Sequence, residues 1–108
     1  MTTPLHLRQS EAQFQEAVIE YAQAQGWMVH AERPARSDKG WRTPVQGDAG
    51  FPDLCLGRLR DGKREVRFLE LKTEIGKLTE SQASWLMCLP NAYLFRPSDW
   101  PQIEEVLA

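Results

Sequence analysis

The chain has 108 residues, with 42% hydrophobic residues, 26% charged residues and a formal net charge of −2. This length suits a single domain with a modest core, and the composition is ordinary for a soluble globular protein. The values argue against a membrane-spanning protein, because no apolar run approaches the length of a span, and the overall charge does not indicate a nucleic-acid partner. The first residues lack the basic start and apolar block of a signal peptide, so we expect a cytoplasmic protein.

The first predicted element is a helix over residues 11–25. Ser10 and Gln13 have the spacing of a capping box at its start, and a glycine follows its expected end. Glu11 and Gln15 lie one turn apart at the edge of its apolar stripe, where a side chain can reach a site beside a sheet. The alternative is that Glu11 is a helix-end charge and Gln15 packs at the rim of the core.

Residues 27–31 are predicted as a first strand, and residues 32–50 follow with several prolines and glycines. A stretch of this length without regular structure is usually functional or mobile in a compact domain, so we expect a loop that contacts substrate. Its Trp41 could stack on an exposed base or anchor the loop to the core. Two clusters of basic residues could contact nucleic acid, and a solvated surface is the alternative for both. They are Arg33, Arg36, Lys39 and Arg42 in this loop and Arg58, Arg60, Lys63, Arg64 and Arg67 further on.

The next two strands are expected on either side of Asp61-Gly62, a strong hairpin signal. The predicted strands run over 53–58 and 64–72. If Asp61 and Gly62 form a type I′ turn, counting back along both strands places Asp53 opposite Glu70, with Lys72 on the same face. Two opposed carboxylates are destabilising unless a cation lies between them, and a divalent metal ion is the obvious candidate. A β-bulge in either strand would shift this count by one residue.

A second helix is predicted from the capping box Thr79-Glu80-Ser81-Gln82 to about Leu89. Gln82 either completes this cap or faces the carboxylates from the helix N-terminus. A strand over residues 92–95 and a short helix that starts at about residue 99 close the chain. The predicted order of elements is α-β-β-β-α-β-α.

Three sequence segments carry a resemblance to a known family. Pro52-Asp53 followed by Glu70-Leu71-Lys72 at a strand end resembles the signature of PD-(D/E)XK nucleases. With Gly50-Phe51 before them and the run from Gly76 to Gln82 after them, these residues resemble the VRR-NUC family, in particular its small stand-alone viral and bacterial members. The resemblance covers about residues 10–98 of one domain that spans residues 1–108. It implies a restriction-endonuclease-like α/β fold with a mixed central sheet flanked by helices. It also implies that the protein acts in the cytoplasm of a bacterial host or a virus-infected cell.

The same resemblance implies metal-dependent hydrolysis of DNA phosphodiester bonds. In such nucleases the carboxylates, here Asp53 and Glu70, hold Mg²⁺ or Mn²⁺ together with a backbone carbonyl, here that of Leu71. The lysine, here Lys72, would orient or help to activate the attacking water. Gln82 matches a position in the downstream motif and would position the lysine or a water molecule.

Such nucleases often carry an acidic residue in the first helix near the metal, and we expect Glu11 in this role with Gln15 as a contributor. Small family members resemble Holliday-junction resolvases, so we expect a homodimeric, structure-selective endodeoxyribonuclease that acts on branched DNA without a small-molecule cofactor. Its backbone contacts should weaken with salt and carry little base specificity. Both basic clusters are expected to supply these contacts, and the residues singled out for them are Arg33, Arg36, Lys39, Arg42 and Lys77.

Three other functions compete with this interpretation. The first is a flap or general DNA nuclease with the same chemistry, which only a panel of substrates distinguishes. The second is a DNA-binding module without catalysis, but such a module gains nothing from two opposed carboxylates that repel phosphate. The third is a plain structural domain, which leaves the coincidence of the hairpin register and the downstream motif unexplained.

Overall fold

The computed structural model describes residues 4–31, 35–37, 40–42 and 45–108. Of the described helices, none is long and apolar enough to cross a membrane. The elements, in chain order, are η1 (Leu5–Leu7), α1 (Glu11–Ala24), β1 (Met28–Ala31), β2 (Ala35–Ser37), β3 (Gly40–Arg42), β4 (Leu54–Arg60), β5 (Lys63–Leu71), α2 (Glu80–Cys88), β6 (Ala92–Phe95), η2 (Pro97–Asp99) and α3 (Trp100–Leu107).

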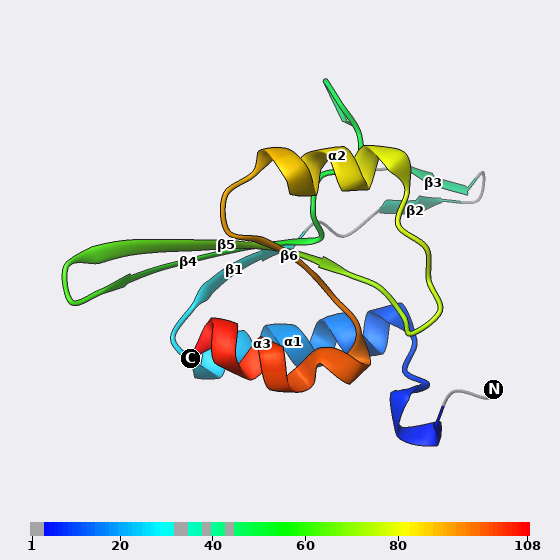
Figure 1. Ribbon diagram of the computed structural model, residues 1–108. Coiled ribbons are helices and arrows are strands. Elements are labelled where there is room, and N and C mark those ends of the chain that lie inside the picture. The colour runs from blue at the N-terminus through cyan, green and yellow to red at the C-terminus, as the bar shows by residue number, and fades with distance from the viewer. Residues whose placement is uncertain (1–3, 32–34, 38–39, 43–44) are drawn as a thin grey trace.

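A four-stranded sheet forms the centre of the molecule, with the strand order β1-β4-β5-β6. β4 pairs in the antiparallel sense with β1 and with β5, whereas β6 joins β5 in the parallel sense. Figure 1 shows α2 on one face of this sheet and α1 with α3 on the other face. The predicted mixed sheet flanked by helices, and the predicted order of these elements, are therefore confirmed.

The face of the sheet toward α1 and α3 carries the hydrophobic core. Alternate leucines of β4 and β5 point into this core because side chains alternate along a strand. The buried residues there are Leu54, Leu56, Leu69 and Leu71 from the sheet, Phe14, Val18 and Ala22 from α1, and Ile103 and Leu107 from α3. The residues between the leucines, which include Phe68 and Glu70, point to the face that bears α2.

Both helices next to the predicted site begin with the capping boxes that the sequence predicted. Ser10 Oγ accepts the Gln13 N–H at 3.1 Å, and Gln13 Oε1 accepts the Ser10 N–H at 3.0 Å. The same exchange opens α2, where Thr79 Oγ1 accepts the Gln82 N–H at 3.2 Å and Gln82 Oε1 accepts the Thr79 N–H at 2.9 Å. Each box pairs N–H groups that the first turn of a helix leaves without a partner, so the start of each helix is fixed.

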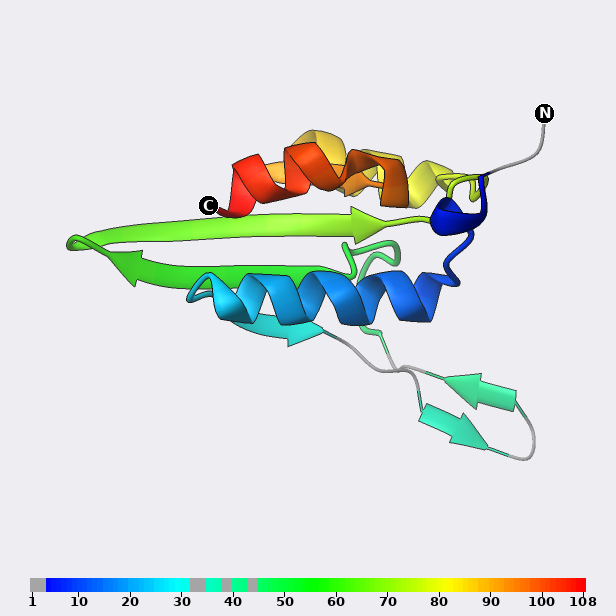
Figure 2. The ribbon, with the colours of Figure 1, turned by 90° about the horizontal axis from the view of Figure 1, so that it is seen from below.

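The segment 32–50 differs from the prediction of a long loop without regular structure. It contains β2 and β3, which pair in the antiparallel sense from Ala35↔Arg42 to Ser37↔Gly40. Figure 2 shows this small hairpin lying away from the central sheet. Strands of three residues among prolines and glycines are too short to give a periodic pattern, which is why the sequence did not reveal them.

Four predicted DNA contacts fall on this segment. Arg33 and Lys39 lie outside the described residues. Arg36 lies on β2 and Arg42 lies on β3, next to Trp41, and the description of these three residues is limited to their backbone.

Candidate active site

The β4–β5 hairpin brings Asp53 and Glu70 together. Asp61 and Gly62 at its turn have φ angles of 53° and 76°, as a type I′ turn requires. The strands pair residue by residue from Arg60↔Lys63 to Leu54↔Leu69. The register predicted from the sequence is confirmed, and its next step sets Asp53 beside Glu70.

The Asp53 carboxylate is fixed across the two strands. Its Oδ2 atom accepts the backbone N–H of Leu71 at 2.8 Å. This bond ties the residue just before β4 to the last residue of β5. The bond therefore holds the Asp53 side chain against the backbone that directly follows Glu70.

Glu70 is a buried carboxyl group in an unfavourable environment. The residue is only 1% exposed, and its buried Oε2 atom accepts no hydrogen bond among the described residues. Burial first, then the charge of Asp53 and a hydrogen bond with it, raise the pKa of Glu70 to about 8, while the Lys72 charge lowers this pKa and the Glu11 charge raises it. Without a cation, the pair of carboxyl groups therefore shares a proton at neutral pH.

Lys72 lies next to this pair. Its Nζ atom is 3.8 Å from Glu70 Oε2, and its side chain is 12% exposed. The Lys72 N–H donates to the carbonyl oxygen of Phe95 at 3.0 Å, so its backbone is paired with the end of β6. The sequence placed Lys72 on the face of Glu70, and the contact between the two side chains confirms this placement.

Glu11 and Gln15 lie on the first helix, as predicted. Glu11 is the first residue of α1 and is exposed, and its charge contributes to the raised pKa of Glu70. Gln15 lies one turn further on and is half-buried. Among the residues that the structure describes, however, no three His, Cys, Asp or Glu side chains converge in a way that could hold a metal ion. Glu11 therefore acts on Glu70 through its charge without joining a compact three-carboxylate cluster.

The donor atoms of this site fit a hard divalent cation. Asp53 and Glu70 supply carboxylate oxygens, and Leu71 lies between Glu70 and Lys72 with a backbone carbonyl to offer. Glu70 Oε2, which accepts no hydrogen bond within the described part of the chain, is a buried acceptor that a cation would satisfy. Mg²⁺ is commonly held by one or two carboxylates, with water and phosphate oxygens completing its shell, so two carboxylates are sufficient.

Gly50 brings the segment before Asp53 into direct contact with α2. Its φ angle is 95°, and a Cβ atom placed on it would lie 2.7 Å from Ser81 Oγ and 2.9 Å from the Gln82 nitrogen. Only glycine adopts this conformation readily and leaves room for the helix backbone. The sequence analysis gave Gly50 no structural role, because this contact joins segments that are distant along the chain.

An aromatic group continues the contact between this segment and α2. The Phe51 ring meets the Trp85 ring edge to face at a centroid distance of 5.1 Å and the Phe68 ring at 5.8 Å. Trp85 Nε1 donates a hydrogen bond to the carbonyl oxygen of Ala49 at 3.0 Å. The residues on both sides of Gly50 are therefore attached to α2, and this attachment sets the direction in which the chain enters Asp53.

Gln82 and Lys77 lie on the α2 side of the site. The amide oxygen of Gln82 is engaged in the capping box with Thr79, so this part of the predicted alternatives is confirmed. Lys77 is exposed in the connection between β5 and α2. A role of Gln82 toward Lys72 would have to use its side-chain NH₂ group.

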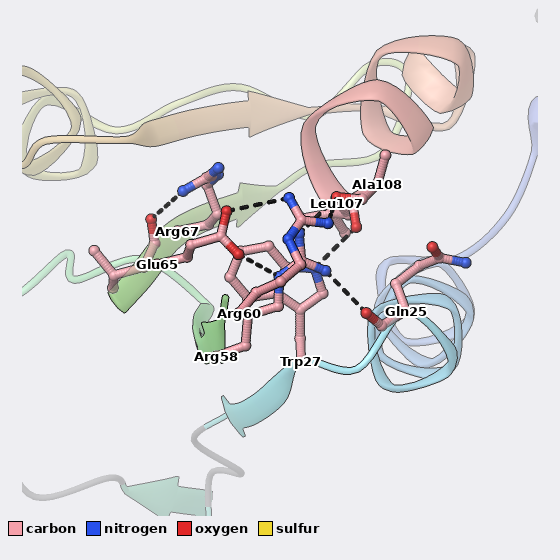
Figure 3. A network of polar contacts seen from close by, with 9 residues as sticks. Gln25, Trp27, Arg58, Arg60, Glu65, Arg67, Leu107 and Ala108 are labelled. Atoms are coloured by element: carbon pink, nitrogen blue, oxygen red, sulfur yellow. Dashed lines mark hydrogen bonds and ion pairs between the residues drawn. The ribbon is translucent and has the colours of Figure 1, made fainter. Parts of the chain in front are cut away.

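Part of the second basic cluster makes structural contacts within the protein, a role that differs from both the DNA contact and the solvated surface considered for the cluster. The Arg58 side chain is 6% exposed, its Nε atom lies 2.7 Å from Glu65 Oε1, and its guanidinium carbon lies 4.0 Å from the centre of the Trp27 ring. It also donates to the carbonyl oxygens of Gln25 and Ala108, at 2.9 Å and 2.6 Å. Figure 3 shows these groups together with Arg60.

This network explains the charge state of Glu65. A hydrogen bond from Arg58, aided by the charges of Arg58, Arg60 and Arg67, holds the pKa of Glu65 below its ordinary value in spite of the opposing effect of burial. Arg60 also donates to the Ala108 carbonyl oxygen at 3.2 Å. A spacing pattern of basic residues does not separate such internal ion pairs from a DNA-binding surface, because the partners lie far apart in the sequence.

Comparison with known proteins gives one match. The model of the VRR-NUC domain family matches residues 11–93, which include the β4–β5 hairpin and α2. No curated protein and no solved structure matches the chain. The match ends before η2 and α3.

Proposed function

The chain belongs to the VRR-NUC domain family, a family of nucleases, and we propose that it is a metal-dependent, structure-selective endodeoxyribonuclease that resolves Holliday junctions as a homodimer. One observation carries the proposal. The half-buried Asp53 lies beside the buried Glu70, whose Oε2 atom accepts no hydrogen bond among the described residues, and the Lys72 amine lies 3.8 Å from that oxygen. A binding module or a structural domain would gain nothing from this costly arrangement.

Mg²⁺ or Mn²⁺ would be held by the carboxylates of Asp53 and Glu70 and the carbonyl of Leu71, with Glu11 nearby and Gln15 as a contributor. The ion would neutralise charge on the scissile phosphate and lower the pKa of the attacking water. Asp53 is held for this task by the Leu71 N–H, so its carboxylate does not have to be ordered when the substrate arrives. Glu70 must release its proton before its carboxylate can bind the ion.

Lys72 would orient the attacking water and place a positive charge beside the phosphate oxygens, where negative charge accumulates in the transition state. Its position beside Glu70 Oε2 supports this role. Gln82 would orient Lys72 or a water molecule through its NH₂ group, because the capping box uses only its oxygen.

DNA would be contacted mainly through its phosphates. The proposed contacts are Arg33, Arg36, Lys39, Arg42 and Lys77. With a net charge of −2, the protein has no general attraction for DNA, so these local groups must supply it. A homodimer suits a four-way junction because the junction presents two equivalent strands to a two-fold symmetric enzyme.

The test is cleavage of a labelled panel comprising a four-way junction, a 5′ flap, a 3′ flap, linear duplex and single strand, with Mg²⁺, Mn²⁺ or EDTA. Wild-type protein is compared with Lys72→Ala, whose folding is checked by circular dichroism and whose junction binding is measured in Ca²⁺. Paired symmetric nicks at the junction that require metal and vanish in Lys72→Ala support the proposal. Metal-dependent cutting of flaps or ends would refute the preference for junctions but leave the nuclease activity standing. Folded protein that cuts none of the substrates would support a binding module.

A further inference from the structure

Arg96 holds the turn that follows the predicted catalytic strand. Its Nη1 atom donates to the carbonyl oxygens of Thr73 at 2.6 Å and Gly76 at 2.7 Å, with that of Glu74 at 3.4 Å. One guanidinium nitrogen therefore donates hydrogen bonds to three carbonyl oxygens of a single turn. Arg96 follows β6 and lies outside the residues 11–93 that the family shares.

The turn depends on this contact because little else holds its carbonyl groups. A bond from the Gly76 N–H to the Thr73 carbonyl, at 3.2 Å, closes the turn. The turn lies between β5 and α2, so its carbonyl groups have no place in a helix or a sheet ladder. Loss of a charged donor from partly buried carbonyl groups leaves acceptors without partners, which favours a rearranged turn.

Lys72 and the residue after it are both hydrogen-bonded to the segment that contains Arg96. Its own N–H donates to the carbonyl oxygen of Phe95, and the next residue, Thr73, accepts from Arg96. Phe95 and Arg96, at and just after the end of β6, therefore bind Lys72 and Thr73, which directly follow β5. A Cβ atom on Gly76 would lie 3.6 Å from Lys72 Cβ, so the turn folds back against the Lys72 side chain.

The backbone around Arg96 is itself fixed. The Arg96 N–H donates to Asp99 Oδ2 at 2.8 Å, and the Asp99 N–H donates to the Arg96 carbonyl oxygen at 2.8 Å. A second link joins the two segments, since the Ser98 N–H donates to Glu74 Oε2 at 3.0 Å. Arg96 thus reaches the turn from a rigid base at the start of η2.

We propose that Arg96 is a positioning residue for Lys72, which fastens the Thr73–Gly76 turn and so sets the backbone from which the Lys72 amine reaches Glu70. This inference rests on the proposed nuclease function for its kinetic consequence. Its structural part, the placement of the Lys72 amine, can be measured without any cleavage.

The experiment compares Arg96→Met and Arg96→Lys with Arg58→Met as a matched control. Arg58 also donates to main-chain oxygens, but it does so at the other end of the sheet, so its loss lowers stability without touching the turn. In Arg96→Met we expect kcat for junction cleavage to fall at least about tenfold, with KM changed less than about twofold, because misplacement of a catalytic group affects the chemical step. Arg96→Lys should recover part of kcat, and Arg58→Met should retain kcat below its unfolding temperature.

Two further measurements separate placement from general loss of stability. Hydrogen exchange of the amides of residues 74–77 and acylation of the Lys72 amine, followed by mass spectrometry, should accelerate in Arg96→Met and remain unchanged in Arg58→Met. If wild-type protein cleaves none of the substrates, the proposed function fails and the labelling result alone decides about Arg96. Equal labelling of Lys72 in wild type and Arg96→Met, or an unchanged kcat, would overturn the inference.

Discussion

Glu70 connects the stability of the site with its chemistry. In the folded protein burial and the charge of Asp53 raise the pKa of Glu70 from its ordinary value of 4.5 to about 8. Between these two values the unfolded chain releases the proton that the folded protein retains. The folded state therefore binds more protons in this range, and the free energy of unfolding falls as the pH rises.

We expect the metal-free protein to be less stable at pH 8 than at pH 5.5, by roughly 1–3 kcal/mol from Glu70. Glu70→Gln should remove this part of the pH dependence, raise stability at pH 8 and abolish cleavage, because an amide needs no proton but is a poor metal ligand. Urea unfolding in EDTA at both pH values measures the effect.

The control for this comparison is Glu104→Gln, which changes an exposed carboxylate on α3. It should keep the wild-type pH dependence and activity. A Glu70→Gln protein whose stability falls with pH as steeply as that of the wild type would contradict the assignment. Mg²⁺ or Mn²⁺ should stabilise the wild type more at pH 8 than at pH 5.5, because protons compete with the ion for Glu70.

At the scale of residues, the sequence predicted the pairing of Asp53 with Glu70 and the placement of Lys72, since all three follow from the count along one hairpin. It did not predict Gly50 against Ser81 or Arg96 against the turn. Those contacts join segments that are brought together only by the complete fold, and no local spacing encodes them. The resemblance marked Gly50 as part of a motif, but the reason for a glycine there is visible only in the structure.

At the scale of elements, the contact between Gly50 and α2 determines how the chain enters the site. Two separate costs oppose a side chain at Gly50, namely its positive φ angle and the close approach of the α2 backbone. Gly47 has a similar φ angle of 101°, but a Cβ atom there would meet nothing within 4 Å. Substitutions at the two glycines therefore distinguish the cost of conformational strain from the cost of a clash with the α2 backbone.

We expect Gly50→Ala to lower the free energy of unfolding by roughly 2–4 kcal/mol, because strain and the clash with the helix act together. Gly47→Ala should cost only about 1 kcal/mol, since strain acts alone. Urea titrations followed by tryptophan fluorescence measure both values. Equal effects of the two substitutions would show that the contact between Gly50 and α2 contributes nothing to stability.

The elements themselves were predictable to different degrees. Both capping boxes, the Asp61-Gly62 turn and the strand at Ala92–Phe95 carry strong local signals, and the structure has each of them. The β2–β3 hairpin does not, because three-residue strands between prolines and glycines have neither the length nor the alternation that identifies a strand. The interpretation of residues 32–50 as a plain loop was therefore wrong in its secondary structure.

At the scale of the whole molecule, the closing helix completes the core and joins distant parts of the chain. Ile103 and Leu107 are fully buried against the sheet, and the Leu107 carbonyl oxygen accepts the Trp27 Nε1–H at 2.9 Å. Arg58 connects the end of α1, the β4–β5 hairpin and the end of α3 through Gln25, Glu65 and Ala108 (Figure 3). This end of the sheet is therefore held in part by internal charges, and the Arg58 guanidinium group is committed to these contacts.

This distinction predicts how salt affects DNA binding. Arg42→Gln should lower the affinity for junction DNA and reduce the slope of log K against log[salt] by about 0.9, the value for one phosphate contact. Arg58→Gln should lower the unfolding temperature and leave the slope unchanged, because its guanidinium group is 6% exposed and already paired with Glu65. Fluorescence anisotropy with labelled junction in Ca²⁺, at several salt concentrations and well below both unfolding temperatures, measures the slopes.

The two variants remove the same charge, so the net charge of −2 becomes −3 in each and a general electrostatic effect would act on both alike. A reduced slope for Arg58→Gln and an unchanged slope for Arg42→Gln would place the DNA over the β4–β5 hairpin instead of the β2–β3 hairpin. Equal reductions would mean that affinity follows total charge rather than particular contacts. Only a difference confined to Arg42 supports a DNA path along β2 and β3 toward the carboxylate pair, since Arg42 ends the strand that leads through Gly50 into Asp53.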